Sequence, residues 1–133
     1  MSRWPTFSNE EIAAVGRVLR SGKVNYWTGD QGKLFEQEFA AYHDVKYAIA
    51  MSNGTVTLEA ALRAINIQPG DEVIVPARTF VATANAVLMC GGTPVFADID
   101  PVSQNITADT IHSKLTDKTR ALIPVHLGGW PCA

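Results

Sequence analysis

From residue 46 onward, short apolar runs alternate with longer segments whose apolar residues recur at helical spacing. The apolar runs cover 46–52, 72–77, 94–99 and 120–127. Each is bounded by Gly, Pro or Asp, which is typical of short buried strands. The helical segments between them cover 55–66, 79–90 and 108–114. This alternation predicts right-handed crossovers and a mostly parallel α/β sheet covered by helices on both faces.

Two further helices are expected nearer the N-terminus. Ser8 is followed by Asn9, Glu10 and Glu11, the pattern of an N-cap with acids in the first turn, and apolar residues then recur at helical spacing as far as Gly22. Residues 22–32 carry three glycines and no period, which predicts a loop. Residues 33–42 return to a helical pattern.

The composition of the chain argues against several classes of function. With 133 residues, of which 47% are hydrophobic and 18% charged, the chain has the composition of one globular domain rather than a disordered segment. A net charge of -2 without a basic stripe argues against a nucleic-acid partner. The absence of a signal-peptide pattern and of an apolar run of ~20 residues predicts a cytoplasmic protein without a membrane partner. Cys90 and Cys132 lack metal-ligand spacing, so we expect reduced thiols and no metal.

One short stretch, 50-AMSNGTVTLEAALRAI-65, passes from an apolar run into a helix with almost no loop. In open α/β sheets, ligands bind beyond the carboxyl ends of strands, where helix N-termini expose free N–H groups. Gly54 would let the backbone approach a ligand or adopt a positive φ. These features predict a cradle for a phosphate-sized anion. The alternative is that Ser52 or Thr55 simply caps the helix, and neither GxGxxG nor GxxxxGK[ST] is present.

A second joint, 73-VIVPARTFVATANAV-87, is expected at the same sheet edge. The chain leaves the strand at Pro76 and brings Arg78, Thr79 and Phe80 toward this edge. Taken alone, Phe80 is either a core residue or a flat apolar surface for a ligand. Asp98, Asp100 and His126 follow the remaining strands, where such residues usually cap turns or hydrogen-bond locally.

The segments 52–107 and 120–131, the second reading RALIPVHLGGWP, resemble the N-terminal part of the DegT/DnrJ/EryC1/StrS family of pyridoxal-phosphate-dependent sugar aminotransferases. Residues 26–42 resemble the segment before that family's first large-domain strand. The resemblance implies a fold-type I, three-layer α/β/α large domain with a seven-stranded, mostly parallel sheet in the order 3-2-4-5-6-7-1. This chain would supply strands 1 to 4 only, which leaves strand 1 without its neighbour, strand 7.

The resemblance also implies a cofactor site. The family's Ser-Gly-Thr segment holds the phosphate of pyridoxal 5′-phosphate, and an aromatic residue after the second strand stacks on the pyridine ring. Backbone N–H groups and the Thr55 hydroxyl would hold the phosphate. The cofactor-binding residues expected on this basis are Asn53, Gly54, Thr55, Val56 and Phe80. Arg78 has no assigned role beyond a substrate contact.

No catalytic residue is expected within the chain. In the family, the Schiff-base lysine and the Asp that binds the pyridine nitrogen lie downstream of the PVHLGGWP segment, beyond Ala133. None of the five lysines matches the family's lysine motif. We therefore expect residues 1–32 to form an N-terminal helix and loop, and residues 33–133 the first part of the cofactor-binding domain. The chain alone would be inactive, and we favour a remnant of a longer protein over a short gene product.

The intact enzyme, as the resemblance implies, would move an amino group from a donor such as glutamate to a keto carbon of a nucleotide-linked deoxysugar. This reaction serves polysaccharide or lipopolysaccharide biosynthesis, and such enzymes are typically homodimers or higher homo-oligomers. Two alternatives remain open. The chain is a non-catalytic fragment or assembly piece of this fold, or it belongs to a sugar dehydratase that uses pyridoxamine phosphate and replaces the lysine with histidine.

Overall fold

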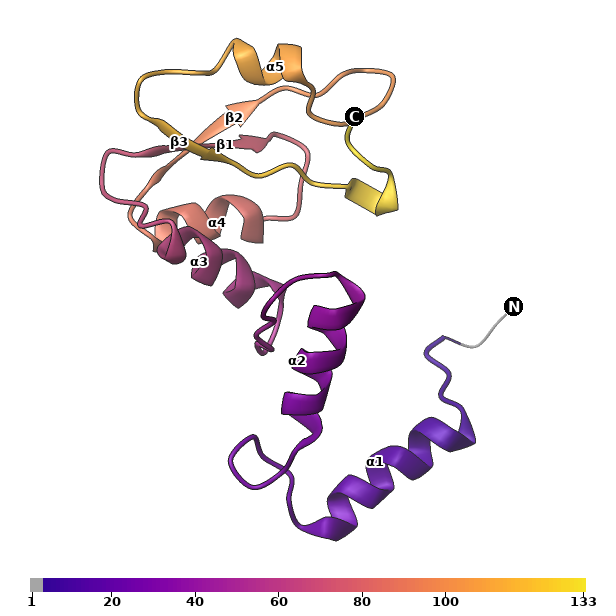
Figure 1. Ribbon diagram of the computed structural model, residues 1–133. Helices are drawn as coiled ribbons and strands as arrows, with labels where there is room; N and C mark the ends of the chain where they lie inside the picture. The colour runs from indigo at the N-terminus through magenta and orange to yellow at the C-terminus, as the bar shows by residue number, and fades with distance from the viewer. Residues whose placement is uncertain (1–3) are drawn as a thin grey trace. The chain divides into compact units, whose positions relative to one another are not determined.

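A three-stranded parallel sheet forms the centre of the C-terminal part of the chain in the computed structural model, which describes residues 4–133 (Figure 1). The strands are β1 (Glu72–Pro76), β2 (Thr93–Ala97) and β3 (Thr119–Leu122). Their order is β2-β1-β3, and both neighbours run parallel to β1. This is the 3-2-4 part of the expected strand order, so the parallel α/β sheet and this part of its topology are confirmed.

The middle strand, β1, is buried on both faces because it is apolar at every position from Val73 to Val75. Val73 and Val75 point to one face and pack with Leu62, Ile67, Ala86 and Val87. Ile74 points to the other face, as the two-residue period of a strand requires, and packs with Ala97 and Ile106. Because the apolar run is continuous, this one strand contributes side chains to a hydrophobic cluster on each face of the sheet.

Helices cover both faces of this sheet. The helices are α3 (Gly54–Ala64) and α4 (Ala82–Met89) on one face, and α5 (Ala108–His112) on the other (Figure 1). The N-cap of α5 is Thr107, whose hydroxyl accepts a hydrogen bond from the Thr110 N–H at 3.4 Å. The α/β/α layering that the pattern predicts is present in this part of the chain.

Two helices precede this sheet: α1 (Asn9–Ser21) and α2 (Gln31–Tyr42). α1 begins with the predicted cap, since the Ser8 N–H donates to the Glu11 carboxylate at 2.6 Å and the Glu11 N–H donates to the Ser8 hydroxyl at 3.2 Å. The bond from the Ser8 N–H to its carboxylate lowers the pKa of Glu11. The helix ends at Gly22, whose φ of 69° lies in the left-handed region.

Contacts divide the chain into two compact units, one ending at Ala50 and the other running from Met51 to Ala133. The first contains α1 and α2, and the second contains the sheet and the other helices. The expected division into residues 1–32 and 33–133 concerns cofactor binding rather than contacts, and it stays a prediction.

The predicted strand over residues 46–52 is wrong in this structure. Tyr47 and Ile49 are 74% and 78% exposed, and within residues 4–133 no strand pairs with this segment. The Ala50 N–H instead donates to the Glu36 carboxylate at 2.8 Å. A strand requires a partner for its backbone, and the three strands of the sheet pair only with one another in residues 4–133.

The third strand also ends earlier than its apolar pattern predicts. β3 stops at Leu122, and one further bond, from the Ile123 N–H to the Ile74 carbonyl at 2.9 Å, continues the ladder. Pro124 has no N–H with which to extend it. The chain then turns through a single 3-10 turn, Leu127–Gly129.

Gly92, which precedes β2, lies where no side chain fits. A Cβ at this position would lie 2.8 Å from Ile67 Cγ2 and 3.2 Å from Val87 Cγ1, both in the core. We expect Gly92→Ala to lower the free energy of unfolding by about 1–3 kcal/mol through overpacking, measured by urea denaturation with circular dichroism. Gly16→Ala in α1 is the control, because only the flexible Arg20 side chain lies nearby. Equal stability of the Gly92 and Gly16 variants would contradict this packing.

Candidate functional site

A cavity of about 500 Å³ lies where two helices begin and the chain leaves β3. Residues 79–80 follow β1 and residues 125–127 follow β3, so the cavity sits at the carboxyl ends of parallel strands, where α/β proteins bind ligands. Its lining residues, from α3, the start of α4 and the segment after β3, are Gly54, Thr55, Thr57, Leu58, Thr79, Phe80, Ala82, Thr83, Val125 and Leu127.

The start of α3 leaves two backbone donors available. Asn53 is the N-cap, with φ -170° and ψ 170°, and its side-chain oxygen accepts from the Val56 N–H at 3.1 Å. The cap is therefore Asn53, and not Ser52 or Thr55. The N–H groups of Gly54 and Thr55 have no acceptor among the described residues. They lie at the positive end of the helix dipole, which favours an anion.

Gly54 is not required by backbone strain or by protein packing. Its φ lies outside the left-handed region, so the positive φ considered from the sequence is wrong. A Cβ placed on Gly54 would meet no atom within 4 Å. Because Gly54 lines the cavity, this space is available to a ligand approaching the backbone closely.

Hydroxyl groups around this helix start differ in their availability. The Thr57 hydroxyl donates to the Gly54 carbonyl at 2.8 Å and is used within the helix. The Thr55 hydroxyl forms no hydrogen bond with any group in residues 4–133. Thr55 therefore offers both a backbone donor and a free hydroxyl to the cavity.

Phe80 lies on the cavity and not in the core. Its side chain is 70% exposed, which excludes the interpretation of Phe80 as a core residue. The turn that carries it is fixed by two bonds: the Thr83 N–H donates to the Phe80 carbonyl at 3.1 Å, and the hydroxyls of Thr79 and Thr83 are hydrogen-bonded at 2.9 Å. Thr83 is buried, so this turn is anchored to the interior.

The segment after β3 adds an apolar wall. Val125 and Leu127 line the cavity, while His126 between them accepts a hydrogen bond on Nδ1 from the Cys132 N–H at 3.0 Å. The Cys132 thiol donates to the Val125 carbonyl at 3.4 Å. Sequence reasoning did not identify Val125 and Leu127. Their two-residue spacing beyond the third strand is the signal that would have found them.

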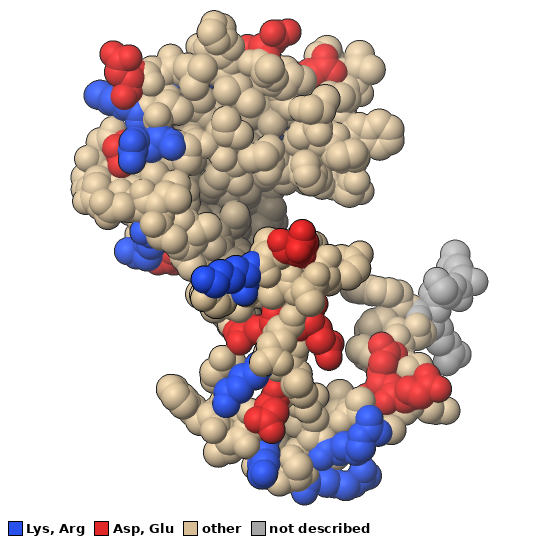
Figure 2. Space-filling model, viewed as in Figure 1, with Lys and Arg blue, Asp and Glu red and all other residues tan. Residues whose placement is uncertain are grey.

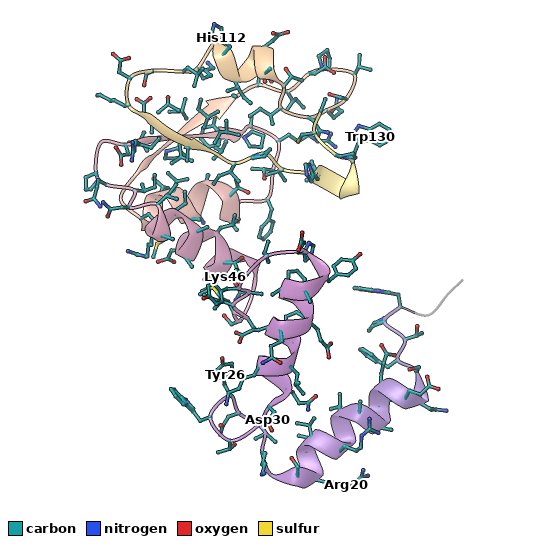
Figure 3. The ribbon with its side chains drawn as sticks, in the orientation of Figure 1. Arg20, Tyr26, Asp30, Lys46, His112 and Trp130 are labelled. Carbon is teal, nitrogen blue, oxygen red and sulfur yellow. The ribbon has the colours of Figure 1, made fainter. Side chains whose placement is uncertain are left out.

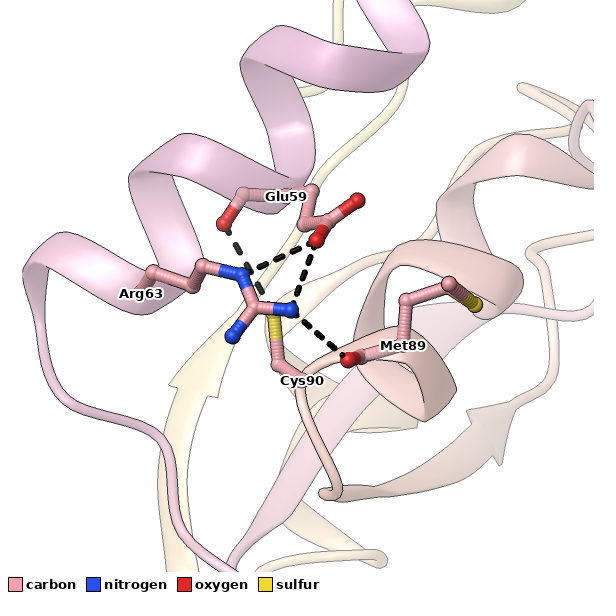
Figure 4. Close-up of polar contacts among 4 residues, drawn as sticks. All are labelled: Glu59, Arg63, Met89 and Cys90. Carbon is pink, nitrogen blue, oxygen red and sulfur yellow. Dashed lines mark hydrogen bonds and ion pairs between the residues drawn. The ribbon is translucent and has the colours of Figure 1, made fainter.

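An interhelical contact holds α3 and α4 together (Figure 4). Arg63 donates to the Glu59 carboxylate from Nε at 2.9 Å and from Nη2 at 2.7 Å, and Nη2 also donates to the Met89 carbonyl at 3.1 Å. The hydrogen bonds that the Glu59 carboxylate accepts raise the pKa of Arg63. The Cys90 thiol donates to the Glu59 carbonyl at 3.6 Å. These bonds help to fix the two helices whose first turns line the cavity.

The structure brings together three of the five predicted site residues: Gly54, Thr55 and Phe80 line one cavity. Asn53 and Val56 are not among its lining residues, and the Val56 N–H donates to the Asn53 side chain in the helix cap. Their role in cofactor binding stays a prediction. His112 and Trp130, labelled in Figure 3, also lie outside its lining.

Nowhere in residues 4–133 do three or more His, Cys, Asp or Glu side chains gather as metal ligands would. No helix in the same range is long and apolar enough to cross a bilayer.

Comparisons with known proteins agree on one family. The profile of the DegT/DnrJ/EryC1/StrS aminotransferase family matches residues 5–133. The spore coat polysaccharide biosynthesis protein SpsC of Bacillus subtilis is 43% identical over 128 residues, which is 96% of this chain and 32% of SpsC. GDP-perosamine synthase of Caulobacter vibrioides is 48% identical over 109 residues, covering 80% of this chain and 29% of that protein.

Solved structures give the same result. An aminotransferase from Psychrobacter cryohalolentis superimposes with a TM-score of 0.94 at 54% identity, over 98% of this chain and 33% of that one. NtdA from Bacillus subtilis, solved with bound cofactor PMP, superimposes with a TM-score of 0.82 at 38% identity. The match covers 92% of this chain and 29% of NtdA. The chain thus spans about a third of the length of the relatives it matches.

Proposed function

Because the chain belongs to the DegT/DnrJ/EryC1/StrS aminotransferase family, we propose that it supplies the phosphate-binding part of the active site of a sugar aminotransferase dependent on pyridoxal 5′-phosphate. The observation that carries the proposal is the meeting of Gly54, Thr55 and Phe80 around one cavity. The substrate is a nucleotide-linked keto-deoxysugar, in keeping with the similarity to a GDP-perosamine synthase and to a spore coat polysaccharide biosynthesis protein.

The chain's own residues fit the cofactor's phosphate. The free N–H groups of Gly54 and Thr55 and the Thr55 hydroxyl provide three donors at a helix N-terminus. Charge-assisted hydrogen bonds of this kind are about twice as strong as neutral ones. The open space beside Gly54 lets phosphate oxygens reach the backbone. The cavity volume also falls in the range of small-molecule sites, roughly 300–1,000 Å³.

The apolar lining fits the cofactor's ring. Phe80 offers an exposed aromatic face on a fixed turn, and an offset ring contact contributes on the order of 1 kcal/mol beyond area burial. Leu58, Val125 and Leu127 add apolar surface that keeps water from the ring. In this proposal Phe80 mainly orients the ring, while Gly54 and Thr55 provide the stronger attachment.

When bound, pyridoxal phosphate supplies an aldehyde that accepts and returns an amino group. The residues of this chain bind and orient it, and we assign none of them a proton-transfer step. The proposed partners are the keto-sugar nucleotide, an amino donor such as glutamate, and a second copy of the protein. In a protein that includes the remaining active-site residues, release of 2-oxoglutarate from L-glutamate in the presence of a keto-sugar nucleotide tests amino transfer.

Phe80→Leu tests the ring contact. We expect its affinity for pyridoxamine 5′-phosphate to fall about fivefold, which corresponds to a loss of ~1 kcal/mol. Isothermal titration calorimetry measures this directly, and the amine form of the cofactor cannot react with surface lysines. Phe96→Leu is the matched control, because Phe96 is also exposed but lies on β2 outside the cavity lining. Equal losses in the two variants, or none in Phe80→Leu, would argue against the proposal.

A further inference from the structure

Arg78 differs in position from the other Lys and Arg residues of the C-terminal unit. It follows β1 and directly precedes Thr79 and Phe80, which both line the cavity. The other basic residues of Met51–Ala133 lie elsewhere, at the C-terminal end of α3 or around the start of β3: Arg63, Lys114, Lys118 and Arg120. Arg78 is therefore the single Lys or Arg at the ligand-binding edge of this sheet. Charged side chains are also sparse on much of the visible surface of this unit (Figure 2).

The charge of Arg78 is not neutralised by a carboxylate. The one ion pair among the described residues joins Arg63 to Glu59. Arg78 Nη1 donates instead to the side-chain amide oxygen of Gln104, at 2.7 Å. An arginine is charged at every relevant pH. Among residues 4–133 this contact leaves most of its five N–H donors without an acceptor.

The two acidic residues that follow the neighbouring strand accept hydrogen bonds from backbone N–H groups of their own loop. β2 ends at Ala97, opposite Pro76, so Asp98 and Asp100 follow at the same edge as Arg78. The Asp98 carboxylate accepts from the Ile99 N–H at 2.8 Å. Asp100 accepts from the N–H groups of two residues of its turn, at 3.1 and 2.7 Å. The local acids thus stabilise the turn and leave the guanidinium unpaired.

Gln104 holds the guanidinium in place. Its φ of 61° is uncommon for a residue other than glycine, and its N–H donates to the Asp100 carbonyl at 2.8 Å. The Gln104 side-chain NH₂ donates to the Pro101 carbonyl at 2.9 Å, which turns the amide oxygen toward Arg78. Gln104 therefore fixes the guanidinium of Arg78, which is next in sequence to two residues that line the cavity.

From these contacts we propose that Arg78 binds an anionic group of the substrate at the carboxyl edge of the sheet, either the diphosphate of a sugar nucleotide or a carboxylate of the amino donor. This inference rests on the proposed function. The planar guanidinium presents parallel N–H donors that match two oxygens of a phosphate or a carboxylate. Gln104 occupies one donor and leaves the others for the substrate.

Arg78→Met tests the assignment in protein saturated with pyridoxamine 5′-phosphate. Binding of inorganic pyrophosphate and of L-glutamate is measured separately by calorimetry. We expect one of the two affinities to fall about tenfold or more, as the loss of a hydrogen bond to a charged group predicts. Arg78→Lys should recover part of that loss because it keeps the charge. Arg120→Met is the matched control, since Arg120 is exposed at the start of β3.

The two ligands separate the sources of the anion. A loss for pyrophosphate identifies the diphosphate, and a loss for L-glutamate identifies the donor carboxylate. No loss for either ligand, or an equal loss in Arg120→Met, overturns the role of Arg78. Titration of the cofactor in the same samples keeps the two proposals apart. If the unmodified protein does not bind pyridoxamine 5′-phosphate, the proposed function fails, whereas normal cofactor binding without an Arg78 effect overturns only this inference.

Discussion

Replacing Gly54 with Glu is expected to lower the affinity for pyridoxamine 5′-phosphate by at least about 100-fold, or roughly 2.7 kcal/mol. The new carboxylate would enter the open space beside Gly54, where the phosphate approaches the backbone. Two unit charges of the same sign ~4 Å apart repel by about 4 kcal/mol at an effective dielectric constant of ~20. The measurement is calorimetric titration of the variant and the unmodified protein.

The same substitution should leave the fold intact. Gly54 is the first residue of α3, where a carboxylate stabilises the helix by typically 0.3–1 kcal/mol. The loss of affinity can therefore be separated from unfolding by a melting curve. Gly54→Gln is the matched control, because it has almost the same shape without the charge. If the Glu and Gln variants lose affinity equally, then steric exclusion alone acts at Gly54 and the predicted charge repulsion is absent.

Ile74→Ala should produce the largest loss of stability. Ile74 is fully buried in the middle strand and packs with Ala97 and Ile106 on the α5 side of the sheet. Truncation of a buried Ile to Ala typically costs about 2–5 kcal/mol, through lost burial and the cavity that remains. Urea denaturation followed by circular dichroism should show a lower midpoint with an unchanged slope.

Val102→Ala serves as its control in the same unit. Val102 is 90% exposed, so this truncation should change the free energy of unfolding by less than about 0.5 kcal/mol. A similar midpoint for the Ile74 and Val102 variants would show that the α5 face of the sheet is not a packed core.

The helices and the three paired strands could be predicted because their signals are local. Ser8 and Gly22 mark the two ends of α1 through capping chemistry that involves only neighbouring residues. The run from Val73 to Val75 is apolar at consecutive positions, which indicates a strand buried on both faces. In each case the information needed lies within a few residues of the element.

The predictions that failed concern features that the local sequence pattern does not decide, namely the pairing of a strand and the choice of a helix cap. Residues 46–52 have a strand-like pattern, but pairing is decided by a second strand and not by the pattern. For the candidate site, the sequence placed Gly54 and Phe80 at the same sheet edge. It could not show that Asn53, rather than Ser52 or Thr55, would cap the helix by accepting from the Val56 N–H. That choice depends on backbone angles that several short polar residues can satisfy.

The five residues of β1 have a consequence for how this unit unfolds. The strand is the shared wall of two apolar compartments, since alternate side chains belong to different clusters. Neither compartment can open without displacing a wall of the other. We therefore expect the two layers of helices to unfold as a single cooperative element, with the cavity at the end of β1 lost in the same transition.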